Sequence, residues 1–333
     1  MAKKILVLPG DGVGPEVISA AVSVLKCATD DVDFTYGDIG LTAYDKTENY
    51  LPAETIDLAT DSNAIIAGVI IDRPKDIAYR NPLRVLKKQL NMYAIVRKFF
   101  PLCETLGTPG IDLILMTGNP DSLMNVIEKE NLDGVTIERY MSKNSCKKLF
   151  KKTMEVAEIK QRKTITCAHR TSLFPVSDGM FTDLFYKEFA ASEFLMNDLE
   201  IDAAASELSM NPEMLDVIVS TDLYGISLAG VAAGMVGGSY LTPMGSIGDS
   251  TGLFEPMYGP KLEMAEKGFV NPTSAILSSA MALDQIGRPL DAENVRKAVR
   301  EVYSKGKVTP DVGGTSTTNE FTNFIIDVLK RNK

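Results

Sequence analysis

The chain has 333 residues, of which 45% are hydrophobic and 24% charged, an ordinary composition for a globular protein of about two domains. This composition excludes a collagen-like, coiled-coil or wholly disordered chain. The 44 acidic residues outnumber the 35 basic ones, and the net charge of −9 disfavours nucleic-acid binding, which needs a basic face.

A buried strand, a glycine-rich loop and a helix are expected to open the chain. The apolar run 5–8 leads into PGDGVGPE at 9–16, and the amphipathic run 17–28 follows. The loop can be a tight turn or an anion-binding loop at a helix N-terminus, and the turn is the first interpretation.

Strands and helices are expected to alternate along the rest of the chain. The expected strands are 64–71, 111–116, 163–167 and 217–220, and the expected helices are 84–91, 147–161, 183–194, 272–286 and 292–304. This alternation predicts an α/β fold with a largely parallel sheet. The segment 225–238 is rich in Gly and Ala, which favours a tight helix contact over a direct chemical role.

Histidine and cysteine usage narrows the chemistry further. The single histidine, His169, excludes zinc sites built from several imidazoles. The four cysteines have neither zinc nor CxxC spacing, so we expect reduced thiols. No signal-like or membrane-spanning run is present, and the sequence therefore predicts a cytoplasmic protein without membrane partners.

Several motifs, in one order along the chain, resemble the β-decarboxylating dehydrogenases, the isocitrate/isopropylmalate dehydrogenase family. They are ILVLPGDGVGPEV at 5–17, LKKQLNMYAIVR at 86–97, HRTSLFPVSDGMF at 169–181, LYG at 223–225, FEPMYG at 254–259, NP at 271–272 and TPDVGGTSTT at 309–318. The resemblance implies a two-domain, non-Rossmann α/β fold with a mostly parallel central sheet and flanking helices. It implies a large nucleotide-side domain, 1–98 plus 253–333, and a small dimerisation domain, 99–252.

The family reaction uses a lysine and a tyrosine as base and acid, and this chain departs from both. Arg170 stands at the lysine position and Met124 at the tyrosine position. Arginine keeps its proton at any working pH and methionine has none to transfer, so both positions are expected to be inactive. His169 precedes Arg170, and an oriented structural imidazole is favoured there over a new catalytic role.

The metal positions implied by the resemblance are also depleted. Asp202 matches the aspartate that a partner subunit supplies, whereas Ile226 and Gly230 replace the other two aspartates. Asp222 stands nearby, where the family has asparagine. One carboxylate is a poor ligand set for a hard divalent cation, so we expect no specific Mg²⁺ or Mn²⁺ site.

Substrate-carboxylate positions are partly kept. Of the three arginines that the family uses, Arg97 is present, while Lys87 and Thr117 occupy the other two positions. Asn81 stands where the family has a residue that touches the variable part of the substrate. Lysine provides charge without a bidentate fork, so a weakened or altered carboxylate grip is expected.

Nucleotide positions give a mixed picture. The resemblance assigns five positions to the cofactor: Glu255, Tyr258, Gly259, Glu263 and Asn271. An acidic residue at 263 would repel a 2′-phosphate, so NAD is the expected cofactor if a dinucleotide binds. Tyr258 replaces a histidine on the adenine side, and Pro260 removes a backbone N–H.

Three hypotheses follow from this pattern. The first is a catalytically degenerate paralogue, regulatory or ligand-binding, which forms a homodimer or a heteromer with an active homologue whose metal site Asp202 could complete. The second is an active NAD-dependent oxidoreductase for an altered 2-hydroxy acid, using Arg170, Lys87, Arg97 and Asp222. The third is a binding module for a nucleotide or a small carboxylate, without chemistry.

Overall fold

The computed structural model describes residues 3–73, 79–118 and 126–332. The chain forms two compact units, one comprising residues 1–92, 101–107 and 236–333, the other residues 93–100 and 108–235. The domain boundaries expected from the resemblance, at 98/99 and 252/253, stay a prediction.

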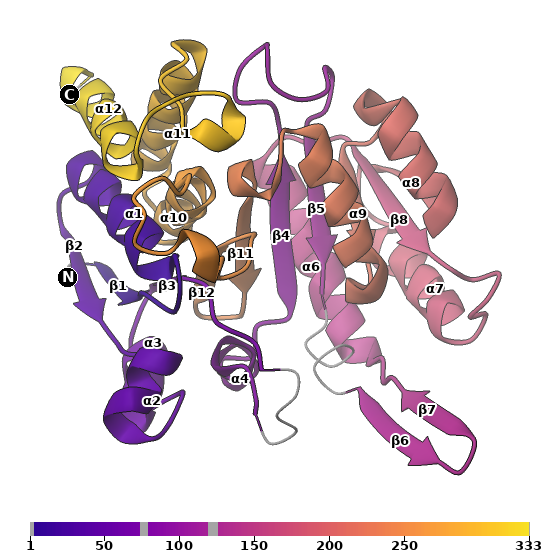
Figure 1. Cartoon of the computed structure of the whole chain (residues 1–333). Coiled ribbons are helices and arrows are strands. Elements are labelled where there is room, and N and C mark those ends of the chain that lie inside the picture. The colour runs from indigo at the N-terminus through magenta and orange to yellow at the C-terminus, as the bar shows by residue number, and fades with distance from the viewer. Residues whose placement is uncertain (1–2, 74–78, 119–125, 333) are drawn as a thin grey trace. The chain divides into compact units, whose positions relative to one another are not determined.

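The first unit is built on five strands in the order β2-β1-β3-β12-β11 (Figure 1). Their bounds are β1 Lys3–Leu8, β2 Val32–Tyr36, β3 Ala64–Ala67, β11 Pro243–Ile247 and β12 Gly252–Pro256. All neighbours are parallel except β11 and β12, which pair antiparallel. The apolar run Ile5 to Leu8 is completely buried, as expected for a strand between two parallel neighbours.

Seven α-helices accompany these strands in the described part of the first unit. They are α1 Gly14–Ala28, α2 Leu41–Thr47, α3 Ala53–Thr60, α4 Pro82–Gln89, α10 Thr273–Gln285, α11 Pro289–Ser304 and α12 Thr318–Arg331. Four of them, α1, α10, α11 and α12, pack side by side (Figure 1). Residues Thr273 to Leu283 of α10 are all buried, which makes this helix the centre of the group.

The second unit has five strands in the order β4-β5-β10-β8-β9. Their bounds are β4 Ala94–Phe99, β5 Leu113–Thr117, β8 Thr164–His169, β9 Leu195–Glu200 and β10 Val217–Ser220. Only β4 and β5 pair antiparallel. Four helices accompany them in the described residues: α6 Lys143–Ile159, α7 Ser177–Phe189, α8 Ile201–Met210 and α9 Asp222–Met235. A separate antiparallel hairpin, β6 Ile127–Asn131 and β7 Gly134–Glu138, is exposed along its whole length.

The α/β class with a mostly parallel sheet is confirmed, and several boundary predictions are wrong, two of them with a physical reason in the structure. The strand expected at 64–71 ends at Ala67, because the next residue, Gly68, approaches the backbone of the first loop. A Cβ at Gly68 would lie 1.9 Å from the carbonyl oxygen of Pro9. The helix expected at 183–194 spans Ser177–Phe189, and its first turn contains the buried Asp178.

Candidate active site

The loop GDGVGPE forms a tight turn whose backbone donors have partners within the first unit. The N–H groups of Asp11, Val13 and Gly14 donate to Val69, Pro260 and Asp11 carbonyls at 2.7, 3.0 and 2.9 Å. The buried Asp11 carboxylate accepts the N–H groups of Leu41 at 2.7 Å and Ile71 at 3.0 Å. Burial raises the pKa of Asp11 even though these bonds oppose the shift. These contacts support the turn interpretation over an anion-binding loop.

The register of β8 and β9 brings Arg170 and Asp202 together. His169 and Glu200 are opposite residues at the carboxyl ends of these parallel strands, so the residues that follow lie at one edge of the sheet. Nη1 of Arg170 lies 2.8 Å from Oδ2 of Asp202 and 3.6 Å from Oε2 of Glu200. The hydrogen bond that Arg170 donates to Asp202 lowers the pKa of Asp202, and the same bond raises the pKa of Arg170. The cation at the lysine position is therefore held in an ion pair.

His169 is buried and held from both ring nitrogens. Its Nε2 lies 2.8 Å from Oδ2 of Asp198, and its Nδ1 accepts the N–H of Thr171 at 3.2 Å. In this arrangement Nδ1 is an acceptor and Nε2 faces the Asp198 carboxylate. Burial would raise the pKa of Asp198, but hydrogen bonds from Tyr186 and His169 outweigh it, and the pKa lies below its usual value. The arrangement supports an orienting, structural histidine.

The three metal positions do not offer a ligand set within this chain. Ile226 on α9 presents an apolar side chain that is 54% exposed, and Gly230, one turn later, has open space where a Cβ would stand. Asp202 is already paired with Arg170, and Asp222 is buried and accepts the N–H of Leu223. Across residues 3–73, 79–118 and 126–332, no three His, Cys, Asp or Glu side chains are grouped to hold a metal ion. Within this chain, Asp202 is thus the one carboxylate at the three metal positions, and the expectation of no specific Mg²⁺ or Mn²⁺ site stays a prediction.

Asn81 at the start of α4 and Lys87 in its last turn both have partners within the first unit. Lys87 forms an ion pair with Glu255 of β12, and their side chains are only 12% and 9% exposed. Asn81 caps α4, because its side-chain oxygen accepts the N–H of Leu83 at 3.0 Å while its amide donates to Asp72. Neither side chain is presented as a free ligand for a substrate carboxylate.

Arg97 and Thr117 lie together on the antiparallel pair β4 and β5. Arg97 is 7% exposed, and its Nη1 donates to Oγ1 of Thr117 at 2.9 Å. Thr117 is packed closely, because a Cβ on Gly225 of α9 would lie 2.0 Å from its methyl group. The one arginine kept from the family set thus binds the residue that replaces another. Met124, at the tyrosine position, lies outside the described residues.

The nucleotide positions cluster in the first unit, around the loop that follows β12. Tyr258 is 9% exposed, Asn271 is buried, and Glu263 is exposed on the short 3-10 helix Leu262–Met264. The Asn271 amide donates to the Tyr303 hydroxyl at 3.1 Å and to Asp311 at 3.0 Å, and its oxygen accepts the N–H of Thr273. All three hydrogen-bonding positions of that side chain have protein partners.

Sequence reasoning missed the residues that neutralise these positions. Asp198 and Glu200 lie in β9, a strand that no periodic pattern in the sequence predicted. Asp178 was part of a motif without being singled out, yet it is completely buried beside Arg139. Polar residues at the carboxyl ends of β8 and β9 were a signal for these contacts. Using that signal requires knowing that the two strands are neighbours in the sheet.

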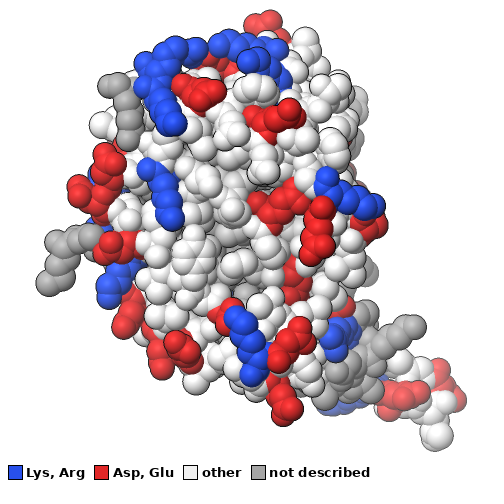
Figure 2. Space-filling model, turned by 60° about the vertical axis from the view of Figure 1, so that its left-hand side comes forward, with Lys and Arg blue, Asp and Glu red and all other residues white. Residues whose placement is uncertain are grey.

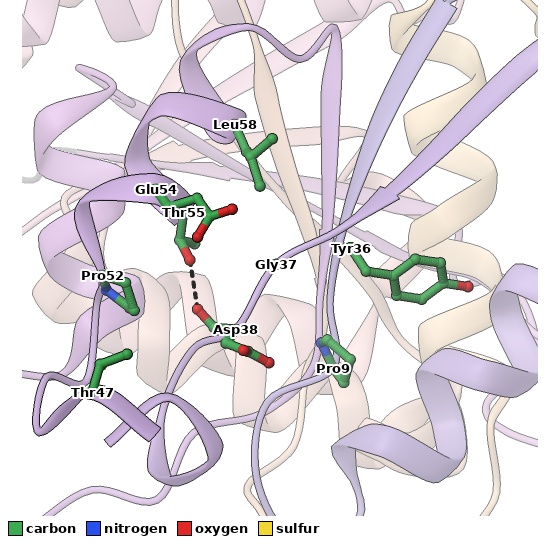
Figure 3. A pocket seen from close by; sticks show the side chains of 9 residues that line it. All are labelled: Pro9, Tyr36, Gly37, Asp38, Thr47, Pro52, Glu54, Thr55 and Leu58. Atoms are coloured by element: carbon green, nitrogen blue, oxygen red, sulfur yellow. Dashed lines mark hydrogen bonds between the residues drawn. The ribbon is translucent and has the colours of Figure 1, made fainter. Parts of the chain in front are cut away.

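A pocket of about 280 Å³ lies at the carboxyl ends of β1 and β2, beside α2 and α3 (Figure 3). Figure 3 shows Thr55 of α3 directed at the backbone of Asp38, to whose carbonyl it donates a hydrogen bond at 2.7 Å. The Asp38 carboxylate is paired with Lys46 at 2.6 Å. The lining consists of Pro9, Tyr36, Gly37, Asp38, Thr47, Pro52, Glu54, Thr55 and Leu58, and it includes none of the predicted site residues.

Surface charge agrees with the composition. Figure 2 shows acidic and basic side chains around a largely uncharged central area of the face it draws, with several basic side chains next to one another along its upper edge. In the part of the chain that the structure describes, no helix is both long and apolar enough to cross a bilayer.

Comparison with known proteins identifies the family. Residues 4–325 match the family model described as isocitrate/isopropylmalate dehydrogenase. The chain is 36% identical over 333 residues to an isocitrate/homoisocitrate dehydrogenase from Thermus thermophilus, with 99% of both chains covered. It is 35% identical to a 3-isopropylmalate/3-methylmalate dehydrogenase from Methanocaldococcus jannaschii, covering 95% of this chain and 96% of that one.

Solved structures agree with this assignment. The crystal structure of isocitrate dehydrogenase from Methylococcus capsulatus has a TM-score of 0.92 and 29% identity, covering 98% of this chain and 99% of that chain. A β-decarboxylating dehydrogenase from Thermococcus kodakarensis, in its apo form, has a TM-score of 0.89 and 29% identity, covering 99% of this chain and 96% of that chain. From its sequence and its fold alike, the chain belongs to the isocitrate/isopropylmalate dehydrogenase family.

Proposed function

We propose that this chain is a catalytically degenerate member of its family, a cytoplasmic regulatory or ligand-binding paralogue rather than a dehydrogenase. The observation that carries the proposal is the ion pair between Arg170 and Asp202. Arg170 stands at the position of the family base, and Asp202 is the one metal aspartate kept. In this conformation the two side chains are bound to each other, and not to a substrate proton or a metal ion.

The chemistry explains why these changes abolish turnover together. Oxidation of a 2-hydroxy acid requires a group that removes the hydroxyl proton and a Lewis acid that polarises its oxygen. The Arg170 guanidinium is paired and remains protonated. Ile226 and Gly230 supply no oxygen ligand, and the thioether of Met124 cannot transfer a proton. Acid–base and metal functions are thus lost at separate positions, and no single reversion restores them.

A homodimer or a heteromer with an active homologue completes the proposal. Apolar side chains at 223, 226 and 231 are exposed on α9, and the hairpin β6–β7 exposes Ile127, Val135 and Ile137. We propose these two segments, the exposed face of α9 and the hairpin, as the surfaces that such a partner would cover. If such a partner is an active homologue, the Arg170–Asp202 pair must open before Asp202 can reach the partner's metal.

Restoring the two missing carboxylates tests the proposal at its metal site. The double variant Ile226→Asp with Gly230→Asp places carboxylates at positions i and i+4 on one face of α9, and neither side chain meets a buried neighbour. We expect this variant to bind Mn²⁺ at least about tenfold more tightly than the parent chain, because affinity for a hard cation follows the number of charged oxygen ligands. Loss of the free Mn²⁺ signal in electron paramagnetic resonance measures it.

The matched control is Ser227→Asp with Gly234→Asp. It adds the same charge to the same helix at exposed positions that are two turns apart, too far to share one ion. Equal Mn²⁺ binding by both double variants would show a general charge effect. Tight Mn²⁺ binding by the parent chain would contradict the proposal outright.

A further inference from the structure

Tyr240 is an aromatic side chain that no motif singled out. It lies on the 3-10 helix Ser239–Leu241, which packs against α10. Two glycines with positive φ, Gly237 at 100° and Gly238 at 125°, lead the chain into this turn. Such backbone angles strain other residues, so the turn that sets the direction of Tyr240 depends on glycine.

The ring of Tyr240 lies among the positions that the family assigns to adenosine. It stacks on Tyr258, with ring centroids 4.3 Å apart and an interplanar angle of 33°. Its hydroxyl donates to the sulfur of Met264 at 3.8 Å, next to Glu263. Burial raises the pKa of Tyr240, and the nearby charges of Asp311 and Glu263 raise it further. Tyr240 therefore lies close to Tyr258, to Glu263 and to Asp311, which accepts a hydrogen bond from Asn271.

The polar groups of this subsite are also used internally. The Tyr258 hydroxyl donates to the backbone carbonyl of Asn271 at 3.4 Å. The Asn271 amide is bound to Tyr303 and Asp311, and Tyr303 also shares a hydrogen bond with Thr273 at 2.8 Å. An adenine ring entering here would have to displace an aromatic ring and would find the Asn271 side chain already paired.

We propose that Tyr240 fills the adenine space of the nucleotide subsite, stacked on Tyr258, so that the chain in this conformation does not bind NAD or ADP. The inference rests on the proposed function, since it extends the loss of catalysis to the loss of cofactor binding. A tyrosine ring is planar and stacks on an aromatic partner as a base does, with a comparable energy. NAD binding would require the ring to leave, and the apparent affinity falls by the fraction of molecules in which it has left.

Removing the ring tests the proposal. ADP binding is measured by isothermal titration calorimetry, without metal or 2-hydroxy acid, for the parent chain and for Tyr240→Ala. We expect Tyr240→Ala to bind ADP at least about tenfold more tightly than the parent, which corresponds to about one stacking interaction. Tyr240→Phe keeps the ring and should bind no better than the parent. Tyr44→Ala removes a tyrosine from a similar stack, with Tyr50 at 4.4 Å, and should also match the parent.

Two results would overturn the proposal. One is ADP binding by the parent as tight as that by Tyr240→Ala. The other is weaker binding by Tyr240→Ala, which would make Tyr240 a platform for the base. Tyr240→Val, which keeps apolar contact with Tyr258, is measured beside the alanine variant in case the latter unfolds. NADH formation is a separate readout: a parent chain that binds ADP without turnover contradicts the closed subsite alone, whereas turnover contradicts the proposed function.

Discussion

Replacing Asp178 by alanine is expected to lower the free energy of unfolding by about 3–5 kcal/mol, because it leaves a charged partner buried and uncompensated. The Asp178 side chain is completely buried. Its Oδ2 accepts the backbone N–H of Arg170 at 2.7 Å. Its Oδ1 lies 3.6 Å from Nη2 of Arg139, whose side chain is 16% exposed. The carboxylate thus joins the first turn of α7 to the end of β8 and to the segment that follows β7.

Urea denaturation followed by circular dichroism measures this change. Asp183→Ala, an exposed aspartate on the same helix, is the matched control and should change the stability by no more than about 0.5 kcal/mol. If Asp178→Ala behaved like Asp183→Ala, then Arg139 would not depend on Asp178 for its counter-charge, which would contradict this prediction.

The second large effect is expected at the pair of Lys87 and Glu255. Glu255→Ala should destabilise the chain by about 3–5 kcal/mol, since it leaves the Lys87 ammonium almost buried without its counter-charge. The double variant Lys87→Met with Glu255→Leu removes both charges and fills the space with apolar atoms. It should therefore recover most of the loss, because apolar replacement of a buried ion pair is often neutral or stabilising.

A double-mutant cycle in urea gives the coupling between the two side chains. Lys297→Met, which removes an exposed lysine from α11 of the same unit, should shift stability by no more than about 0.5 kcal/mol. Additive effects of the two single substitutions at 87 and 255 would mean that the side chains do not interact. In that case Lys87 would be free to bind a substrate carboxylate, and one argument for degeneracy would fail.

The sequence predicted the class of fold and the positions at which this chain departs from the family motifs, because both depend on local patterns. Strand 217–220 and the opening strand are contiguous apolar runs, and the motifs fixed positions such as 97, 170 and 202. The hairpin β6–β7, whose two loop residues are Leu132 and Asp133, was missed because its strands are exposed along their whole length and bury no apolar face. The boundaries of helix α7 were misplaced because its first turn contains a buried aspartate, Asp178, where an apolar pattern gives no signal.

The partners of those positions could not be read from the sequence. Arg170 meets Asp202 only because β8 and β9 are parallel neighbours in one register. Lys87 and Glu255 are separated by 168 positions along the chain. Tyr240 lies outside every motif, and motif comparison asks only which residue stands at a prescribed position. It does not ask whether another part of the chain fills the ligand's space.

NADH formation by the purified chain is the most direct measurement of the proposed loss of catalysis. The chain is incubated with NAD or NADP, Mg²⁺ or Mn²⁺, and isocitrate, homoisocitrate or 3-isopropylmalate, and nucleotide absorbance is followed over time. We expect no reduction above the rate without protein, because the proposal gives Arg170 no role as a base and the positions 226 and 230 no metal ligand. Metal-dependent reduction of NAD at an ordinary enzyme rate, about 1 s⁻¹ or faster, would contradict the proposed function.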